Sequence, residues 1–270
     1  MAESTEIKEV EERGLSFSES LTNQLNAIGN GLPRNFNISK FVNNCVYVMN
    51  NNDTVIDYIK KYPKTGVAQV KACMIRGAYV GLDFMSQECY LVPYKSKLDF
   101  MISYRGAVKL AKKYSVTPIK NIYAEVIRQG DLIKYGTKAD GTQYLEFEPV
   151  ALNEGEIIGA FAVCIYENGA FNYCVMTRAE IEKCKNASSN SGAVWKAWYS
   201  EQAKKSVLKR LCKNIQIEFD STEMRKEFDY EGEMVEQNTE VPDFDLEDTE
   251  TTEVFQECEV VNGEVEETKP

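Results

Sequence analysis

The sequence predicts a mixed α+β domain and argues against alternating βαβ units. Apolar residues recur at helical spacing in the first third of the chain, alternate at strand spacing between glycine turns in the middle, and return to helical spacing before residue 217. The expected order is N-terminal helices, central antiparallel hairpins and a meander that include a basic helix, and then a C-terminal aromatic and basic helix. A disordered acidic tail is expected to follow.

Helices are expected in the first third. Ser18 is a capping residue for a short helix through SLTNQLNAIGNG that would end at glycine, and Asn37 or Ser39 begins a second helix through FVNNCVYVMN. From Thr65 onward, apolar residues recur at intervals of three and four through GVAQVKACMIRGAYVGL. Gly81 lies near the end of this segment and suits a helix C-cap.

A hairpin and a basic helix are expected next. ECYLVPYK and LDFMISY alternate like two strands, and the tip between them carries Lys95 and Lys97. The segment RGAVKLAKKY, residues 105–114, then changes to helical spacing. At about 100° per residue, one arc of this helix collects its positive charges: Arg105, Lys109, Lys112 and Lys113.

A strand-rich meander is expected over residues 117–176. Its turn signals are the pairs Gly130-Asp131, Asp140-Gly141 and Asn168-Gly169. Thr177 then suits the N-cap of a helix through RAEIEKCKNA. The stretch SSNSG, residues 188–192, predicts a flexible link to the segment that follows.

The segment WKAWYSEQAKKSVLKRLCK, residues 195–213, holds both tryptophans of the chain. A helical projection gives it a core-facing stripe made of Ala203, Val207, Leu208, Leu211 and Ile215. The opposite arc gathers rings and cations, while Lys204 falls within the apolar arc: Trp195, Trp198, Tyr199, Lys205, Lys209, Arg210 and Lys213. Single-stranded nucleic acid suits such a face, because cations follow the phosphates and rings stack on bases. Alternatively, Trp195 lies before the helix and fixes it to the core, and the lysines form a solvated face.

The charge divides the chain into three regions. Residues 1–20 carry six acidic and two basic side chains, and residues 218–270 carry twenty acidic and three basic ones. The body between them has sixteen acidic and twenty-six basic side chains. We therefore expect a disordered acidic N-terminus over 1–17, a folded core over 18–217 and an acidic, mostly disordered tail over 218–270.

Composition argues against several classes of enzyme. The chain has no histidine, which removes the commonest general base and most catalytic zinc sites, and it has no GxxxxGK[ST] loop for ATP. Asp131, Glu146 and Glu148 leave a magnesium-dependent nuclease as an alternative. Scattered cysteines without a CxxC pair, the lack of a signal peptide and the lack of a membrane-length apolar run predict a cytoplasmic protein with no membrane partner.

Four segments carry a resemblance to a known family. In the order YLVPYKSKLDFMISYRGAVKLAKKY, AEVIRQGD, VMTRAEIEK and WKAWYSEQAKKSVLKRL, the chain resembles the RecT family of bacteriophage single-strand annealing proteins over residues 20–217. The stretch Tyr104-Arg105-Gly106 is similar to the family's aromatic-Arg/Lys-Gly segment. The closing aromatic and basic helix of the family is similar to the segment that carries Trp195, Tyr199, Lys204, Lys205 and Arg210. Relatives can have tryptophan where this chain has Tyr199.

The resemblance implies an ATP-independent recombinase of the bacterial host cytoplasm. Such a protein binds single-stranded DNA, oligomerises on it into rings or helical filaments, and anneals it to a complementary strand beside a phage exonuclease. The partners would be single-stranded DNA, the annealed duplex intermediate and further copies of the chain. No cofactor is expected, although Mg²⁺ could influence DNA binding, and no covalent catalysis is expected. A passive single-stranded DNA-coating protein is the rival.

The candidate DNA-binding residues fall into three groups. The expected phosphate contacts are Arg105, Lys109, Lys112, Lys113, Lys205, Lys209 and Arg210. The rings expected to stack on bases or to shape the groove are Trp195, Trp198 and Tyr199. The set is completed by Lys95, Lys97 and Lys204.

The acidic tail suggests an interaction of its own. The stretch VPDFDLEDTE, residues 241–250, sets Phe244 and Leu246 among carboxylates. Such a segment could compete with DNA for the basic body, or dock on a partner such as the host single-strand-binding protein. A tail that only keeps the protein in solution is the alternative.

Overall fold

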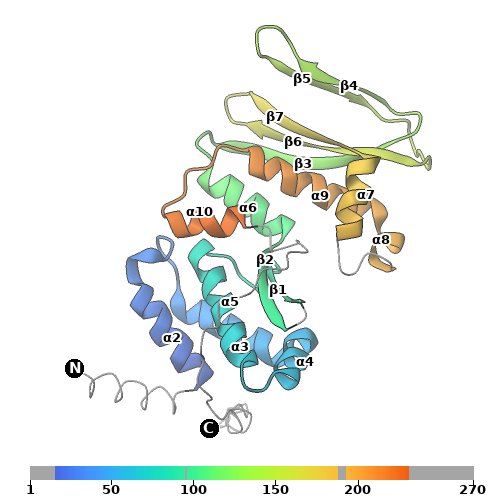
Figure 1. The fold of residues 1–270 in the computed structure, drawn as a ribbon. Coiled ribbons are helices and arrows are strands. Elements are labelled where there is room, and N and C mark those ends of the chain that lie inside the picture. Colours follow the sequence, from blue (N-terminus) through green and yellow to red (C-terminus); the bar gives the residue numbers. More distant parts are fainter. Residues whose placement is uncertain (1–15, 95, 188–192, 231–270) are drawn as a thin grey trace, which may run out of the picture.

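The computed structural model describes residues 16–94, 96–187 and 193–230. Within this part of the chain, Figure 1 shows the N-terminal helices with a short hairpin at one end of the molecule, and a larger antiparallel sheet with further helices against it at the other. The predicted α+β class is confirmed. Lys95, the predicted link at 188–192, residues 1–15 and residues 231–270 lie outside the described residues, and so do the predictions made for them.

Helices fill the first third, as predicted: α2 Phe17–Ile28, α3 Ile38–Asn51, α4 Asp53–Lys61 and α5 Gly66–Val80, with the 3₁₀ turn η1 Gly29–Gly31 after α2. The cap of α2 is Ser16 and not the predicted Ser18, because Ser16 and Glu19 form a reciprocal capping box. Asn37, one of the two predicted caps, begins α3. Gly81 ends α5 at a φ of 66°, as predicted.

The predicted hairpin and basic helix are confirmed. Strands β1 Cys89–Tyr94 and β2 Lys97–Ile102 pair antiparallel from Cys89↔Ile102 to Tyr94↔Lys97. Helix α6, Tyr104–Tyr114, follows β2 at once. The hairpin packs against α5, and Phe100 of β2 is fully buried in the main core.

The predicted meander forms two layers. Strands β3 Ile119–Arg128, β6 Ile157–Tyr166 and β7 Phe171–Thr177 make an antiparallel sheet in the order β3-β6-β7, and β4 Leu132–Thr137 with β5 Gln143–Glu148 make a separate hairpin. The alternation along β6 explains the layers, because Ala162 joins the main core whereas Phe161 joins a second cluster. In that second cluster the rings of Phe147 and Phe161 lie 4.8 Å apart, so the β4-β5 hairpin covers the face of the sheet opposite the helices.

The predicted turns are confirmed by their backbone conformation. Gly130, Gly141 and Gly169 have φ values of 98°, 83° and 83°, which side chains rarely tolerate. Thr177 caps α7, Arg178–Ala187, through a box in which its hydroxyl and its N–H both contact the Glu180 carboxylate.

The aromatic and basic segment forms two helices, which corrects the prediction of one. Helix α8 covers Ala193–Ala197 and α9 covers Tyr199–Asn214, and Trp198 interrupts them with φ −132° and ψ 42°. The core-facing stripe of α9 is confirmed, because Ala203, Val207 and Leu211 are fully buried. α9 packs across β6, β3 and β7 and against α6, so it lies between the sheet and the rest of the molecule (Figure 1).

The folded core extends past the predicted boundary at residue 217. Helix α10, Thr222–Asp229, packs on α5 and buries Met224 and Phe228, so this stretch of the predicted disordered tail belongs to the core. Arg76 of α5 fastens it, because its guanidinium contacts Asp99 of β2 at 2.8 Å and Glu227 of α10 at 2.8 Å. The Tyr230 ring lies 4.3 Å from the same guanidinium, and the Tyr230 hydroxyl donates to Asp99. We call these four residues the Arg76 clamp.

Candidate nucleic-acid interface

Helix α6 displays positive charge from a rigid base. The Ser103 hydroxyl accepts from the Gly106 N–H and donates to the Gln87 carbonyl, which fixes the first turn. Gly106 is buried there, and a Cβ at this position would overlap the Glu88 carbonyl oxygen. The opposite face is open to solvent and carries the predicted cations: Arg105, Lys109, Lys112 and Lys113.

Helices α6 and α9 bring two predicted cations to one ring. Arg105 of α6 lies 5.9 Å from the centre of the Tyr104 ring and donates to its hydroxyl at 3.2 Å. Lys205 of α9, a hundred residues along the chain, lies 5.8 Å from the same ring centre. Cations attract the faces of aromatic rings at such distances. Two positive charges from separate helices therefore flank a single tyrosine.

An exposed ring, that of Tyr90, lies near the partly buried Tyr104. Tyr90 is 41% exposed and occupies an outward position of β1. Partial burial raises the pKa of Tyr90, while the charge of Arg105 acts in the opposite direction, so the two side chains are close enough to interact. We call Tyr90, Tyr104, Arg105 and Lys205 the tyrosine–cation cluster.

Helix α9 continues the positive charge away from the cluster. Lys205, Lys209 and Lys213 are four residues apart, so they lie on one side of the helix over about 12 Å. We call these three residues the cationic stripe. Lys209 and Lys213 also line a small pocket with residues of β2, α6 and the C-terminal end of α10.

Three cations of the predicted DNA-binding set are paired with carboxylates. Lys109 contacts Glu88 at 2.6 Å, Lys204 contacts Glu201 at 2.8 Å and Arg210 contacts Glu180 at 2.6 Å. The pKa of Glu180 falls to about 2, first because it accepts from the Thr177 backbone N–H and then because Arg210 donates to it. Arg210 thereby ties α9 to the start of α7, and each of these three cations contributes less net positive charge than its position suggests.

The rings of residues 195–199 are in unlike environments. Trp195 is 5% exposed and packs edge-on against Tyr199 at 5.7 Å, within the main core. Its predicted position on the open arc is therefore wrong, because Trp198 breaks the helix on which that projection depended. The alternative, in which Trp195 lies before the helix and fixes it to the core, is confirmed. Tyr199 is partly buried, and burial raises its pKa to about 12. Trp198 is 63% exposed and is the ring of the three that is open for stacking.

The hairpin tip lies away from the α6–α9 surface. Lys97 is exposed at the start of β2, and α6 begins just past the other end of that strand. Six residues of strand span about 20 Å. The tip instead meets the N-terminal helices, since the Tyr58 hydroxyl of α4 donates to the Ser96 carbonyl at 2.8 Å. The structure thus does not bring Lys97 to the tyrosine–cation cluster.

The three carboxylates considered as magnesium ligands, Asp131, Glu146 and Glu148, are either hydrogen-bonded to loop residues or exposed on a strand. Asp131 accepts from the N–H groups of Arg128 and Val150 and from the Asn153 side chain, which lowers its pKa and holds two loops together. Glu146 and Glu148 are exposed on β5. Within the described residues, no three His, Cys, Asp or Glu side chains are grouped so that they could hold a metal ion.

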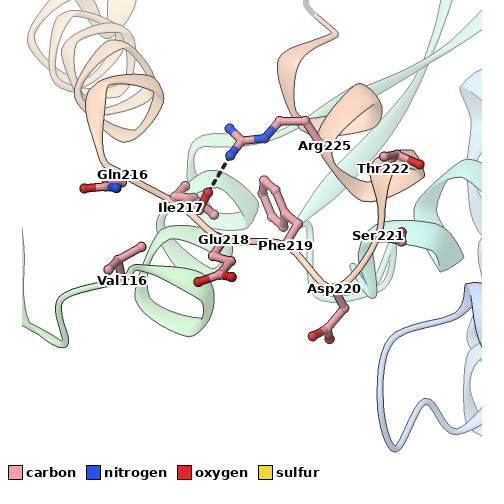
Figure 2. A pocket seen from close by; sticks show the side chains of 9 residues that line it. All are labelled: Val116, Gln216, Ile217, Glu218, Phe219, Asp220, Ser221, Thr222 and Arg225. Atoms are coloured by element: carbon pink, nitrogen blue, oxygen red, sulfur yellow. Dashed lines mark hydrogen bonds between the residues drawn. The ribbon is translucent and has the colours of Figure 1, made fainter.

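An open pocket of about 550 Å³ lies beyond the end of α9 (Figure 2). It is formed by the connection between α9 and α10 together with Val116, and Arg225 donates to the Ile217 carbonyl across it. Glu218 and Asp220 outnumber Arg225 in its lining, so the net charge of the pocket is negative and it is a poor site for phosphate. Its charge is therefore opposite in sign to that of the cationic stripe.

Sequence reasoning missed some members of this surface. The outward position of Tyr90 follows from the alternation of β1, and this signal could have identified it. Tyr104 stands beside Arg105 in the sequence, but its approach to Lys205 joins segments a hundred residues apart. No local pattern encodes such a contact.

Within the described ranges, no helix has both the length and the apolar character needed to cross a bilayer.

Comparison with known proteins gives consistent matches. The model of the RecT family matches residues 39–266. Protein RecT of Escherichia coli (strain K12) is 25% identical over 173 residues, which cover 59% of this chain and 63% of that protein. The uncharacterized protein YqaK of Bacillus subtilis (strain 168) is 30% identical over 137 residues, which cover 51% of this chain and 46% of that protein. The chain thus spans less than two thirds of each of these relatives.

Proposed function

This chain belongs to the RecT family, and on that premise we propose that it binds single-stranded DNA along α6 and α9 and promotes its annealing to a complementary strand without ATP. The family is one of recombination and single-strand annealing proteins. DNA binding, annealing and self-assembly are proposed here for this chain from the arrangement of its own side chains.

The observation that carries the proposal is the tyrosine–cation cluster. Arg105 and Lys205 come from different helices and flank Tyr104 at 5.9 and 5.8 Å. A nucleotide offers a phosphate and a planar base, and a binding surface for it needs a cation beside an exposed ring. Tyr90 and the 63% exposed Trp198 supply further rings, and the cationic stripe supplies further positive charge.

The mechanism is electrostatic. Each ammonium or guanidinium that contacts a phosphate releases a condensed counterion and reduces the repulsion between two approaching strands. Phosphate contacts carry no sequence information, so the incoming strand reads the bound one by base pairing. Copies of the chain assembled along the DNA would hold the first strand extended and the new duplex in register.

A coating protein is the second candidate, because an exposed ring such as Trp198 could also cover bases and slow pairing. Complementary labelled oligonucleotides separate the two. An annealing protein speeds their pairing at saturating protein, whereas a coating protein slows it. A phage exonuclease and the host single-strand-binding protein are proposed as partners, the latter through the acidic tail.

The DNA-binding surface is tested by a paired substitution. Replacing Arg105 and Lys205 by glutamine should weaken binding of a 30-nucleotide oligothymidylate at least tenfold in 0.1 M salt. It should also reduce the slope of log K against log salt by about 1.4, or about 0.7 for each lost phosphate contact. The control replaces Lys134 and Lys138, which are exposed on and beside β4, by glutamine. Equal losses in both variants would refute the surface.

A further inference from the structure

The end of the described chain meets the cationic stripe. A small pocket is lined by Lys209 and Lys213 of α9 and by Phe228 and Tyr230 at the end of α10. Tyr230 is the last described residue before the acidic tail. The last described residue before the acidic stretch 231–250 therefore lies beside two of the three lysines of the stripe.

This end of the described chain is held in place. Phe228 and Met224 of α10 are buried in the main core. The Arg76 clamp also holds the helix to α5, because Arg76 binds Glu227 at 2.8 Å and lies 4.3 Å from the Tyr230 ring centre. The start of the tail is thus tied to one place on the surface.

The charge of the tail complements the stripe. Residues 231–250 contain nine acidic and no basic side chains, and the first of them are Glu231, Glu233 and Glu236. Successive Cα atoms are about 3.8 Å apart, so Glu231 and Glu233 begin within about 4 and 11 Å of the Tyr230 Cα. Attraction at 0.1 M salt acts over a Debye length of about 10 Å, so these carboxylates would be attracted to Lys209 and Lys213 where they come within that distance of them. A tethered partner at such range acts at an effective concentration near the millimolar scale.

The same lysines belong to the surface proposed for DNA. Lys209 follows Lys205 of the tyrosine–cation cluster by one helical turn, and Lys213 follows by two. An acidic segment that starts at Tyr230 and follows the stripe would run toward the cluster. It would present carboxylates to the lysines where DNA would present phosphates.

We propose that residues 231–250 dock on Lys209 and Lys213 and cover the proposed DNA path until single-stranded DNA displaces them. The docking contact stands by itself, and the competition with DNA rests on the proposed function. The tail acts as an internal polyanion that makes binding selective for DNA long enough to replace it.

The docking contact is tested by zero-length carbodiimide cross-linking of the full-length protein. We expect Lys209 and Lys213 to be joined to carboxylates of residues 231–250, and these links to decrease when oligothymidylate is added. The pair Lys109 and Glu88, 2.6 Å apart, is the internal positive control. Links at the control pair without any between the tail and the two lysines would overturn the docking.

The competition is tested with matched full-length variants. In one, the nine carboxylates of residues 231–250 are replaced by their amides, and in the other, the six carboxylates of residues 251–270 are replaced. The first should tighten oligothymidylate binding about threefold to tenfold in 0.05 M salt and leave it unchanged in 0.5 M salt, because salt screens the competing contact. The second should stay within about twofold of the parent.

The outcomes separate the two proposals. Equal affinities of the parent and both variants in 0.05 M salt would overturn the competition, and a gain confined to the 251–270 variant would overturn the assignment to residues 231–250. If neither variant nor the parent binds oligothymidylate, the proposed function fails, while the cross-links still decide whether the tail docks on the stripe.

Discussion

Replacing Arg76 by alanine should destabilise the protein by about 3 kcal/mol, since removal of one partner leaves buried charges uncompensated. Arg76 binds Asp99 and Glu227 at 2.8 Å each, and it joins α5, β2 and α10, which are far apart in the sequence. Burial opposes the charged form, but the two carboxylates prevail and raise the pKa of Arg76. The guanidinium is therefore charged at neutral pH and compensates both carboxylates.

The magnitude follows from the burial of the three side chains. Removing one partner of a fully buried pair costs about 3–5 kcal/mol. Here the side chains of Arg76, Asp99 and Glu227 keep 24%, 13% and 18% of their exposure, so the low end applies. For a protein of this size, about 3 kcal/mol lowers the melting temperature by roughly 6–12 °C.

Thermal and urea unfolding followed by circular dichroism measure this loss. Arg76→Lys keeps the charge but not the forked geometry, so it should lose about half as much. Arg178→Ala removes a surface pair with Glu156, whose side chains are 44% and 61% exposed, and it should cost under about 1 kcal/mol. The reasoning is refuted if Arg76→Ala is no more destabilising than Arg178→Ala, or if amide exchange in α10 does not accelerate.

Two further predictions concern the C-terminal helices. Trp195→Ala should destabilise the protein by about 3–5 kcal/mol, because it removes a buried ring. Trp198→Ala should leave the melting temperature nearly unchanged and weaken oligothymidylate binding by about 1–3 kcal/mol. A larger loss of stability in Trp198→Ala than in Trp195→Ala would contradict the assignment of the buried and exposed rings. The Thr177 N–H and then Arg210 depress the pKa of Glu180 from 4.5 to about 2, so its contribution to stability is complete above pH 4.5 and is lost as pH falls toward 2. The stability difference between the parent and Glu180→Gln in urea unfolding should therefore shrink over that window, and a constant difference would argue against this contact.

Much of the fold follows from local patterns. The β1-β2 hairpin, the glycine turns and α6 each depend on spacing or turn chemistry within one short segment, so the sequence is sufficient to predict them. Helix α10 escaped prediction because it is short and lies in an acidic region of the chain, which hid the pair Met224 and Phe228, four residues apart on one face. Ser221 caps the helix, and burial of that pair against α5 stabilises a segment that is too short to be a stable helix alone.

The candidate site could be predicted only in part. The charges of α6 and α9 follow from sequence, but their partners do not, since Glu88 and Glu180 reach Lys109 and Arg210 across the fold. The projection that put Trp195 in solvent assumed one unbroken helix. Because the helix is interrupted at Trp198, the Trp195 ring packs in the core instead. Long-range contacts decide these cases, and helical periodicity contains no information about them.

The central claim is that positive charge shared by α6 and α9 brings complementary strands together. The most direct measurement is the annealing rate of complementary labelled oligonucleotides with a variant in which Arg105, Lys205 and Lys209 are glutamine. The control makes the same change of charge at three exposed lysines elsewhere: Lys60, Lys134 and Lys138. The account predicts annealing at least about tenfold slower with the first variant and nearly unchanged with the control. Annealing at the full rate by the first variant, with its circular dichroism spectrum intact, would contradict it.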